Sequence, residues 1–111
     1  MVAAHPLLSI RPATADDVPL IRQLIAELAE YERLADAAVA TDDDLRAQLF
    51  GAQPAAEVLI GEVDGEAAGF ALFFHNFSTF LGKRGLYLED LFVRPAFRGS
   101  GLGRHLMASL A

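Results

Sequence analysis

The first half of the chain carries its apolar residues at helical spacing. A short apolar segment over residues 7–11 predicts a strand. Beyond it, apolar side chains recur every three or four positions, which predicts an amphipathic helix over residues 15 to about 34. A second, shorter helix is expected from Thr41 to Gly51. Thr14 and Thr41 are each followed three residues later by aspartate, a weaker version of the capping box that marks a helix start.

From Ala55 onward the apolar spacing shortens to that of strands. Residues 58–63 and 68–74 flank an Asp64-Gly65 pair, which predicts a β-hairpin with a tight turn. The second of these strands is apolar on both faces and should be buried. Residues 76–84 are expected to form a loop, and residues 86–93 another strand. A last helix should start near Gly101, which gives a mixed α/β domain without internal repeats.

Residues 86–104, LYLEDLFVRPAFRGSGLGR, combine an apolar strand, two adjacent acids and alternating glycines at a helix start. Glycines let backbone N–H groups approach an anion, and the positive end of a helix dipole favours negative charge. The spacing of Gly99, Gly101 and Gly103 fits neither GxxxxGK[ST] nor GxGxxG. The stretch therefore predicts a phosphate cradle of another kind beside a pair of carboxylates.

Composition narrows the class of protein. At 111 residues, 53% of them hydrophobic, the chain is expected to be one folded domain, residues 1–111. There is no cysteine, which excludes disulfides and thiol catalysis. No apolar stretch is long enough to span a membrane and no secretory leader is evident, so a cytoplasmic protein is expected, without a membrane partner.

The net charge of −6 argues against nucleic acid as a partner and is compatible with a cationic substrate. The acids at residues 16–17 and 42–44 have a simpler explanation, because acids in the first turn of a helix stabilise its dipole.

The segment from Arg98 to Gly103, RGSGLG, resembles the acetyl-CoA pyrophosphate loop [QR]xxGx[GA] of the GNAT N-acetyltransferases. LYLEDLFV before it, and IRPATADD with LIRQLIAELAEYE near the N-terminus, are similar to the diamine (spermidine/spermine) and thialysine acetyltransferase branch. The resemblance implies a mainly antiparallel sheet flanked by helices, with strand 86–93 central. Since the family continues with more strands and a helix, we expect a C-terminally truncated chain holding about two-thirds of the fold, with strand 86–93 lacking one neighbour.

The resemblance also implies roles for residues. Glu89 would contact the substrate amine and act as the base, through water, while Tyr31 and Glu32 would line the amine site. Backbone N–H groups of residues 91–93 would align the acetyl and pantetheine portions, and one would act as an oxyanion donor. The residues expected to hold acetyl-CoA are Leu91, Phe92, Val93, Arg98, Gly99, Ser100, Gly101, Leu102, Gly103 and Arg104.

The residues by themselves leave some of these roles open. Because strand side chains alternate between faces, Glu89 and Asp90 can enter one cleft only if a bulge re-aims one of them. Otherwise they are a solvent-facing acid and an edge acid in an ion pair. The cost of burying an acid in an apolar strand favours a function for Glu89 and leaves Asp90 undecided. A Tyr-Glu pair at a helix end is more often an ordinary surface feature.

Other chemistries receive little support from the sequence. His5, His75 and His105 are scattered without metal-ligand spacing, so no metal is expected. Ser78 and Ser100 lack a triad signature. The family's tyrosine general acid lies in a later segment, and Tyr87 is on the wrong element to replace it.

Three hypotheses follow. The first is an enzyme that moves an acetyl group from acetyl-CoA to a polyamine-like or thialysine-like primary amine, by direct attack in a ternary complex and as a homodimer. The second is an acetyltransferase for another amine, such as an amino acid, an antibiotic or a protein. The third is a truncated CoA-binding or oligomerisation module without turnover.

Overall fold

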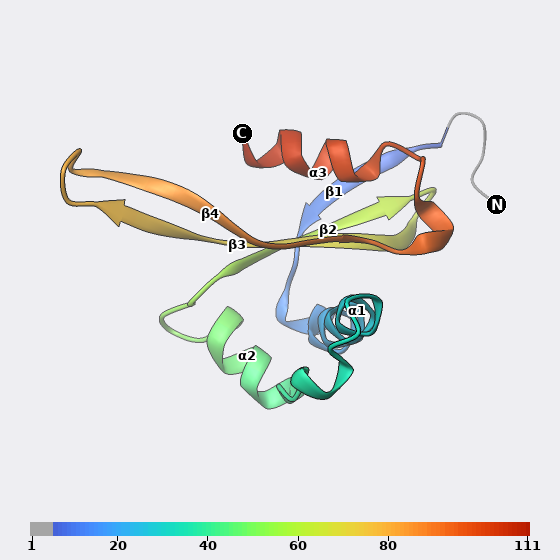
Figure 1. Ribbon diagram of the computed structural model, residues 1–111, viewed down its shortest axis with the longest axis horizontal. Coiled ribbons are helices and arrows are strands. Elements are labelled where there is room, and N and C mark those ends of the chain that lie inside the picture. The colour runs from blue at the N-terminus through green and yellow to red at the C-terminus, as the bar shows by residue number, and fades with distance from the viewer. Residues whose placement is uncertain (1–5) are drawn as a thin grey trace.

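The computed structural model describes residues 6–111 and consists of one twisted antiparallel sheet with helices on both faces (Figure 1). The four strands lie in the order β1-β2-β3-β4, so each pairs with its neighbour in sequence. Helices α1 and α2 cover one face and α3 covers the other. The expected α/β class with a mainly antiparallel sheet is confirmed. The strands are β1 Leu8–Pro12, β2 Glu57–Val63, β3 Glu66–Ser78 and β4 Lys83–Val93.

Helix α1 is shorter at both ends than the sequence predicts. Helix α1, Val18–Tyr31, starts later than expected because Ala15–Asp17 forms a 3-10 turn before it. It ends two residues before Arg33, whose positive φ of 59° breaks helical geometry. Helix α3 spans Leu102–Leu110.

Helix α2, Asp42–Phe50, has the capping box that the sequence predicts. The backbone N–H of Thr41 donates to the Asp44 carboxylate at 2.8 Å, and the backbone N–H of Asp44 donates to Thr41 Oγ1 at 3.1 Å. Two of the backbone donors at this helix start are thereby satisfied locally.

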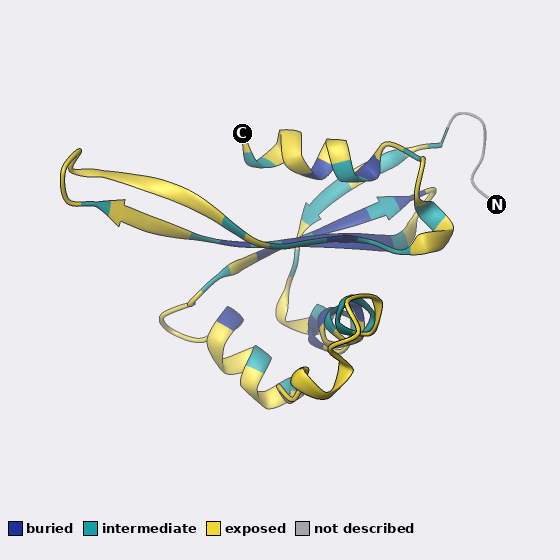
Figure 2. Cartoon of the chain, viewed as in Figure 1, coloured by how far each residue is buried: buried dark blue, intermediate teal, exposed yellow. Residues whose placement is uncertain are grey.

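The hydrophobic core consists of two layers, one on each face of the sheet (Figure 2). The layer under α1 and α2 contains Ile21, Leu24, Leu49, Val58, Ile60, Phe70 and Phe92. The layer under α3 contains Val63, Ala68, Ala71, Leu102 and Leu106. The inner half of β3 lies between both layers, which explains why its sequence is apolar on both faces.

The Asp64-Gly65 turn between β2 and β3 has positive φ at both central residues, 51° and 82°. This is the combination that two-residue hairpins favour, because it matches the twist of the flanking strands. The predicted hairpin is confirmed.

The loop expected over residues 76–84 is wrong. Strands β3 and β4 remain paired as far as Ser78 and Lys83, and the connection is only residues 79–82. The paired strands project from the body as an arm (Figure 1), which we define as residues 74–87. The arm lies beyond the last β3 residue that pairs with β2, Phe73, and its side chains are mostly exposed. Without a buried face, its sequence shows no strand-like alternation.

Strand β4 lacks one neighbour in the described sheet, as expected. It pairs only with β3 and is an edge strand among residues 6–111, although the resemblance makes the corresponding strand central in the family's sheet. The backbone groups on its outer side therefore lack a partner strand among residues 6–111.

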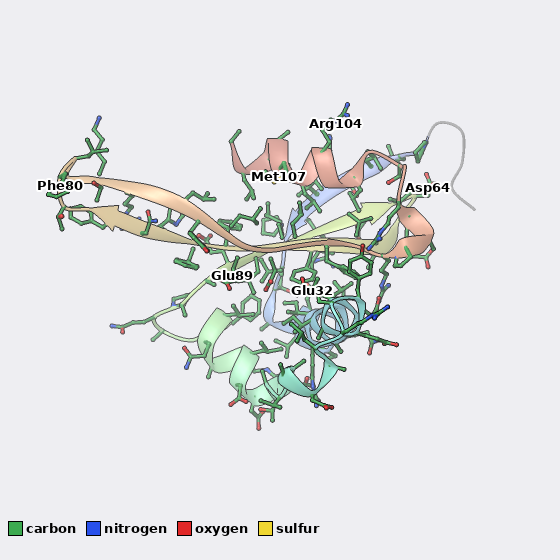
Figure 3. All side chains as sticks on the ribbon, in the orientation of Figure 1. Glu32, Asp64, Phe80, Glu89, Arg104 and Met107 are labelled. Atoms are coloured by element: carbon green, nitrogen blue, oxygen red, sulfur yellow. The ribbon has the colours of Figure 1, made fainter. Side chains whose placement is uncertain are left out.

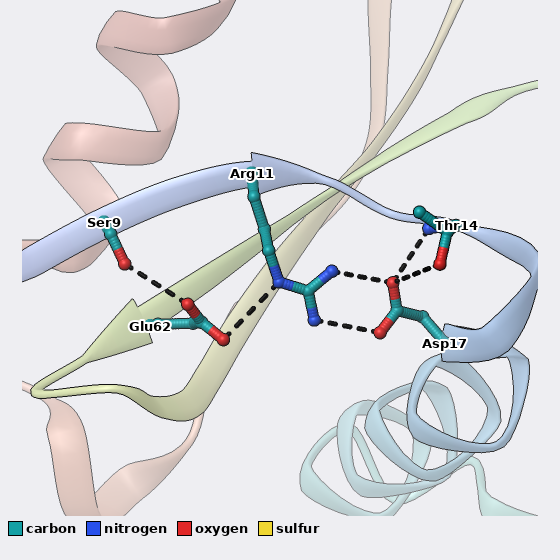
Figure 4. A network of polar contacts seen from close by, with 5 residues as sticks. All are labelled: Ser9, Arg11, Thr14, Asp17 and Glu62. Atoms are coloured by element: carbon teal, nitrogen blue, oxygen red, sulfur yellow. Dashed lines mark hydrogen bonds and ion pairs between the residues drawn. The ribbon is translucent and has the colours of Figure 1, made fainter.

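A polar network connects the first two strands to the start of α1 (Figure 4). Arg11 donates two hydrogen bonds to the Asp17 carboxylate, at 2.7 and 2.9 Å, and a third to Glu62 at 3.4 Å. The hydrogen bond from Arg11 lowers the pKa of Asp17 to about 2, although partial burial opposes this.

Among the residues that the structure describes, no helix is both long and apolar enough to cross a membrane.

Candidate active site

A β-bulge in β4 lies at the two adjacent acids. Asp90 is opposite Leu72 and Leu88 is opposite Phe73, so Glu89 is the extra residue between two consecutive pairs. Such a bulge changes which face the following side chains occupy. Leu88 and Leu91 consequently both pack on the α3 side, although they are three residues apart. The bulge that the sequence required if both acids were to enter one cleft is therefore present.

The acids of the bulge come close to the end of α1. Figure 3 shows Glu89 and Glu32 on the side of the sheet that carries α1 and α2. Burial raises the pKa of Asp90, and the negative charges of Glu89 and Glu32 raise it further. Three carboxylates from two elements thus share one electrostatic environment. A cation placed among them would relieve their repulsion.

The burial of the two β4 acids is the reverse of what the sequence suggested. Glu89 is exposed and Asp90 is half-buried. The burial cost that favoured a function for Glu89 therefore applies to Asp90, whose role the sequence left undecided.

The end of α1 is held against β4 by one ion pair and one aromatic contact. Arg94 donates two hydrogen bonds to the Glu27 carboxylate, at 2.9 and 3.0 Å. Burial raises the pKa of Glu27, but the hydrogen bonds from Arg94 and Gln23 outweigh it and lower the pKa overall. The Tyr31 ring lies 6.4 Å from the Phe92 ring, centroid to centroid. The predicted pair at the end of α1, Tyr31 and Glu32, is therefore next to β4.

The glycine-rich loop has the open backbone that anion binding requires. Gly99 and Gly101 adopt φ values of 84° and 90°, which side-chain-bearing residues rarely adopt. No atom would lie within 4 Å of a Cβ added at Gly99. The loop borders a cavity of about 550 Å³ whose lining is Val93, Phe97, Arg98, Gly99, Ser100, Gly101, Leu102, Gly103 and Arg104. These features fit a diphosphate at the start of α3.

Two loop side chains have distinct orientations. Ser100 Oγ accepts a hydrogen bond from the backbone N–H of Leu102 at 3.2 Å and so helps to start α3. Arg104 points away from the sheet (Figure 3).

The outer edge of β4 presents backbone groups beside this cavity. The backbone N–H of Arg94 donates to Ala68 O at 2.7 Å, so these two residues form a hydrogen-bonded pair. In an antiparallel ladder, hydrogen-bonded pairs alternate with pairs that are not hydrogen-bonded. Counting back from Arg94, the backbone N–H and C=O groups of Phe92 point toward β3, whereas those of Leu91 and Val93 point away from it. The side chain of Phe92 packs in the core.

A contact not anticipated from sequence joins the loop to the end of α1. The guanidinium carbon of Arg98 lies 4.3 Å from the centroid of the Tyr31 ring. Arg98 Nε also donates to Val93 O at 3.2 Å. The structure thus brings together residues that the sequence assigned to different halves of the site. No sequence signal announces this contact, whereas the one-residue phase shift between Leu88 and Leu91 could have revealed the bulge.

The remaining candidate residues lie elsewhere. His75 is 3.6 Å from Glu57 at the base of the arm, His105 is exposed on α3, and His5 falls outside the described residues. Within residues 6–111, no three histidine, aspartate or glutamate side chains are grouped so that they could hold a metal ion.

Comparisons with a family profile and with known proteins both point to acetyltransferases. Residues 20–111 match the profile of the Acetyltransferase (GNAT) family. A thialysine N-epsilon-acetyltransferase from Bos taurus is 38% identical over 110 residues, covering 92% of this chain and 64% of the relative. A human spermidine/spermine N(1)-acetyltransferase-like protein 1 is 38% identical over 109 residues, covering 92% of this chain and 16% of the relative. The chain thus spans less than two-thirds of either relative.

A solved structure shares the fold. An integron cassette protein from the mobile metagenome of V. cholerae superposes with a TM-score of 0.71 at 26% identity. The alignment covers 93% of this chain and 65% of that protein.

Proposed function

The chain belongs to the GNAT acetyltransferase family, and from this premise we propose that it transfers an acetyl group from acetyl-CoA to a primary amine of a small, flexible, polyamine-like or thialysine-like substrate. The observation that carries the proposal is the bulge at Glu89. It gathers carboxylates from β4 and the end of α1 next to a glycine-rich loop suited to a diphosphate. One site can therefore attract both a cation and an anionic carrier.

The acetyl-CoA side of the site is assigned to Leu91, Val93 and residues 98–104, and Phe92 is left out because its backbone faces β3 and its side chain lies in the core. The backbone N–H groups of the loop and the start of α3 would hold the diphosphate. The N–H and C=O groups of Leu91 and Val93, at the outer edge of β4, would align the pantetheine arm as a neighbouring strand would. A backbone N–H of the segment would stabilise the developing oxyanion.

The amine side of the site is assigned to Tyr31, Glu32 and Glu89. An alkylammonium with a pKa of about 10.4 must lose a proton before it can attack, which costs roughly 4–5 kcal/mol at pH 7. Glu89 would accept this proton, directly or through a water molecule. The pKa of Asp90 is raised chiefly by burial and further by the charges of Glu89 and Glu32, and this gathering of negative charge would attract the amine.

The chemistry balances as an acyl transfer. Bound acetyl-CoA supplies a thioester carbonyl, and the amine nitrogen forms a bond to its carbon while the carbon–sulfur bond breaks. The ammonium gives up two protons in the course of the reaction. One passes to Glu89 and the other to the departing thiolate, so the products are an acetamide and the CoA thiol. No acyl-enzyme is needed, in keeping with the absence of cysteine.

We place the protein in the cytoplasm as a homodimer with a single acetyltransferase domain, residues 1–111. The support for assembly is the arm part of β4, residues 83–87, whose outer edge has no partner strand among residues 6–111, since exposed strand edges favour pairing with another chain. Sedimentation of the purified chain at several concentrations tests this part.

The test of the activity is thiol release from acetyl-CoA in the presence of spermidine, thialysine or a peptide amine, with the acetylated product identified by mass. We expect turnover with the first two amines. Glu89→Gln should lower kcat by about 100-fold or more, because the base is lost. The matched control is Glu66→Gln, an exposed acid at the β2–β3 turn, which should leave kcat unchanged.

A second measurement tests whether Glu89 and Asp90 share one electrostatic environment. Removing the charge of Glu89 should lower the pKa of Asp90, as NMR titration of the carboxyl carbon would detect. Binding of acetyl-CoA without any product from wild-type protein would contradict the enzymatic proposal and favour a CoA-binding module.

A further inference from the structure

The Arg98 side chain holds groups from both halves of the proposed site at once. Its guanidinium carbon is 4.3 Å from the centroid of the Tyr31 ring, within the range of a cation–π contact. Its Nε donates to Val93 O at 3.2 Å. Arg98 is the first residue of the loop, Tyr31 ends α1 and Val93 ends β4. One cation therefore connects the loop and the end of β4 to the end of α1, which is distant from both in sequence.

Both partners of Arg98 are groups that the proposed reaction needs. Val93 O lies on the outer edge of β4, where the pantetheine arm would align. The Tyr31 ring is proposed to line the amine site. One face of a tyrosine ring accommodates one cation at close range, so the guanidinium and a substrate ammonium exclude each other there. In this arrangement Arg98 covers binding groups of both substrates.

Arg98 also lies beside the predicted diphosphate position. A guanidinium forms bidentate, charge-assisted hydrogen bonds with phosphate oxygens, which are stronger than its bonds to a carbonyl or a ring face. A diphosphate in the loop would therefore compete with Tyr31 and Val93 O for the same side chain.

We infer that Arg98 is a positioning residue with two alternative sets of partners, and that it makes amine binding depend on acetyl-CoA. Without a diphosphate, Arg98 covers the Tyr31 ring and Val93 O. When a diphosphate is in the loop, Arg98 turns to it and releases both groups. Acetyl-CoA then strengthens amine binding, and the amine strengthens acetyl-CoA binding by the same factor. This inference rests on the proposed function.

The first test is calorimetric titration of wild-type, Arg98→Met and Arg98→Lys chains with CoA, with pantetheine, which lacks the diphosphate, and with spermidine. We expect Arg98→Met to bind CoA about ten-fold more weakly. The same variant should bind pantetheine and spermidine about two- to five-fold more tightly, because a contact of cation–π strength no longer covers their sites. Arg98→Lys should fall between wild type and Arg98→Met.

The matched control is Arg104→Met, which removes a charge from the same loop where the side chain points away from the sheet. It should weaken CoA binding and leave the affinities for pantetheine and spermidine unchanged. Weaker or unchanged binding of both ligands in Arg98→Met would overturn the inference.

A second readout follows Tyr31 directly. The chain has two tyrosines, so a Tyr87→Phe background leaves Tyr31 as the only tyrosine signal in NMR. CoA should move its ring resonances toward their positions in Arg98→Met. If CoA binds and these resonances stay in place, the inference is wrong while the proposed function stands. If wild-type protein binds no CoA, the proposed function itself fails.

Discussion

Strands β3 and β4 run through two environments, and the contrast explains where the site lies. Their inner halves lie in the body, where Phe70 and Phe92 are 0% and 3% exposed. Their outer halves form the arm, where Phe77 and Phe80 are 63% and 99% exposed. The same antiparallel ladder joins both halves. Strand pairing can therefore shape an arm, but only the inner half gains the burial that stabilises the fold.

The overall dimensions reflect this division. The longest axis measures 46 Å against 32 and 27 Å, and the radius of gyration is 14.7 Å. A compact chain of this length would have a radius of gyration of about 13 Å. Glu89 marks the boundary between the halves, so the proposed site lies where the body ends and the arm begins.

The contrast between the body and the arm predicts that the largest loss of unfolding free energy follows substitution of Phe70. Phe70→Ala removes a fully buried ring between β2 and β4 and should cost about 3–5 kcal/mol of unfolding free energy, because it leaves a cavity in the core. Urea denaturation followed by far-UV circular dichroism measures this loss. Phe77→Ala in the arm is the comparison variant, and an equal loss there would mean that the arm is as tightly packed as the body.

The same substitution, glycine to alanine, can be compared at one position in the body and one in the arm. A Cβ at Gly69 would lie 2.4 Å from the backbone oxygen of Phe92, and one at Gly85 would lie 2.4 Å from Oδ1 of Asn76. Backbone in the paired body cannot move aside, so Gly69→Ala should cost about 1–3 kcal/mol. The Asn76 side chain in the arm can rotate away, so Gly85→Ala should cost clearly less. The shift in urea midpoint tests both, and equal shifts would contradict the looser packing of the arm.

The ion pair between Arg11 and Asp17 makes the stability of the body depend on pH. The pKa of Asp17 is lowered to about 2, chiefly by the hydrogen bond from Arg11, and an unfolded aspartate titrates near about 3.9. A carboxylate with a lowered folded pKa stabilises the fold above the unfolded pKa, and this contribution is lost as pH falls through the folded one. Asp17→Asn should therefore cost about 1–2 kcal/mol at pH 7, after allowance for partial exposure.

The same difference between wild type and Asp17→Asn should shrink between about pH 5 and pH 2. Urea unfolding at several pH values measures it. A difference that stays constant across this range would show that the substitution acts through packing.

The smallest effect is expected at Phe80. Its side chain is 99% exposed at the tip of the arm, so Phe80→Ala should change the unfolding free energy by no more than about 0.5 kcal/mol in either direction. Urea unfolding at low and high protein concentration provides the measurement. A larger loss that grows with concentration would instead show that the arm tip is buried between copies of the chain.

Much of the body could be predicted from sequence because its signals are local. The Thr41–Asp44 cap and the Asp64-Gly65 turn depend on residues within a few positions of one another, and both were predicted. For residues 76–84 of the arm the sequence predicts a loop, because these side chains have no buried face to impose alternation. The missing neighbour of β4 was expected from the family resemblance alone, because no local pattern records which strands lie beside it.

The candidate site also has features that local sequence predicts and features that depend on the packing of distant segments. The glycine loop was recognisable because its conformations need glycine at fixed positions, Gly99 and Gly101. Neither the raised pKa of Asp90 nor the contact between Arg98 and Tyr31 was predicted, since both depend on the packing of α1 against β4. Packing of this kind between distant segments is a tertiary property.

The bulge at Glu89 has a consequence for how the chain tolerates insertions and deletions. Side chains alternate along a strand with a period of two, so losing a single residue from one strand turns the following side chains to the opposite face. In the arm, residues face each other in pairs such as Phe77 and Arg84. Removing or adding such a pair changes the length of the arm and the facing of its tip, but Asp90 and everything after it keep their register with β3. The arm can therefore vary in length while the end of the sheet that carries the proposed site stays the same.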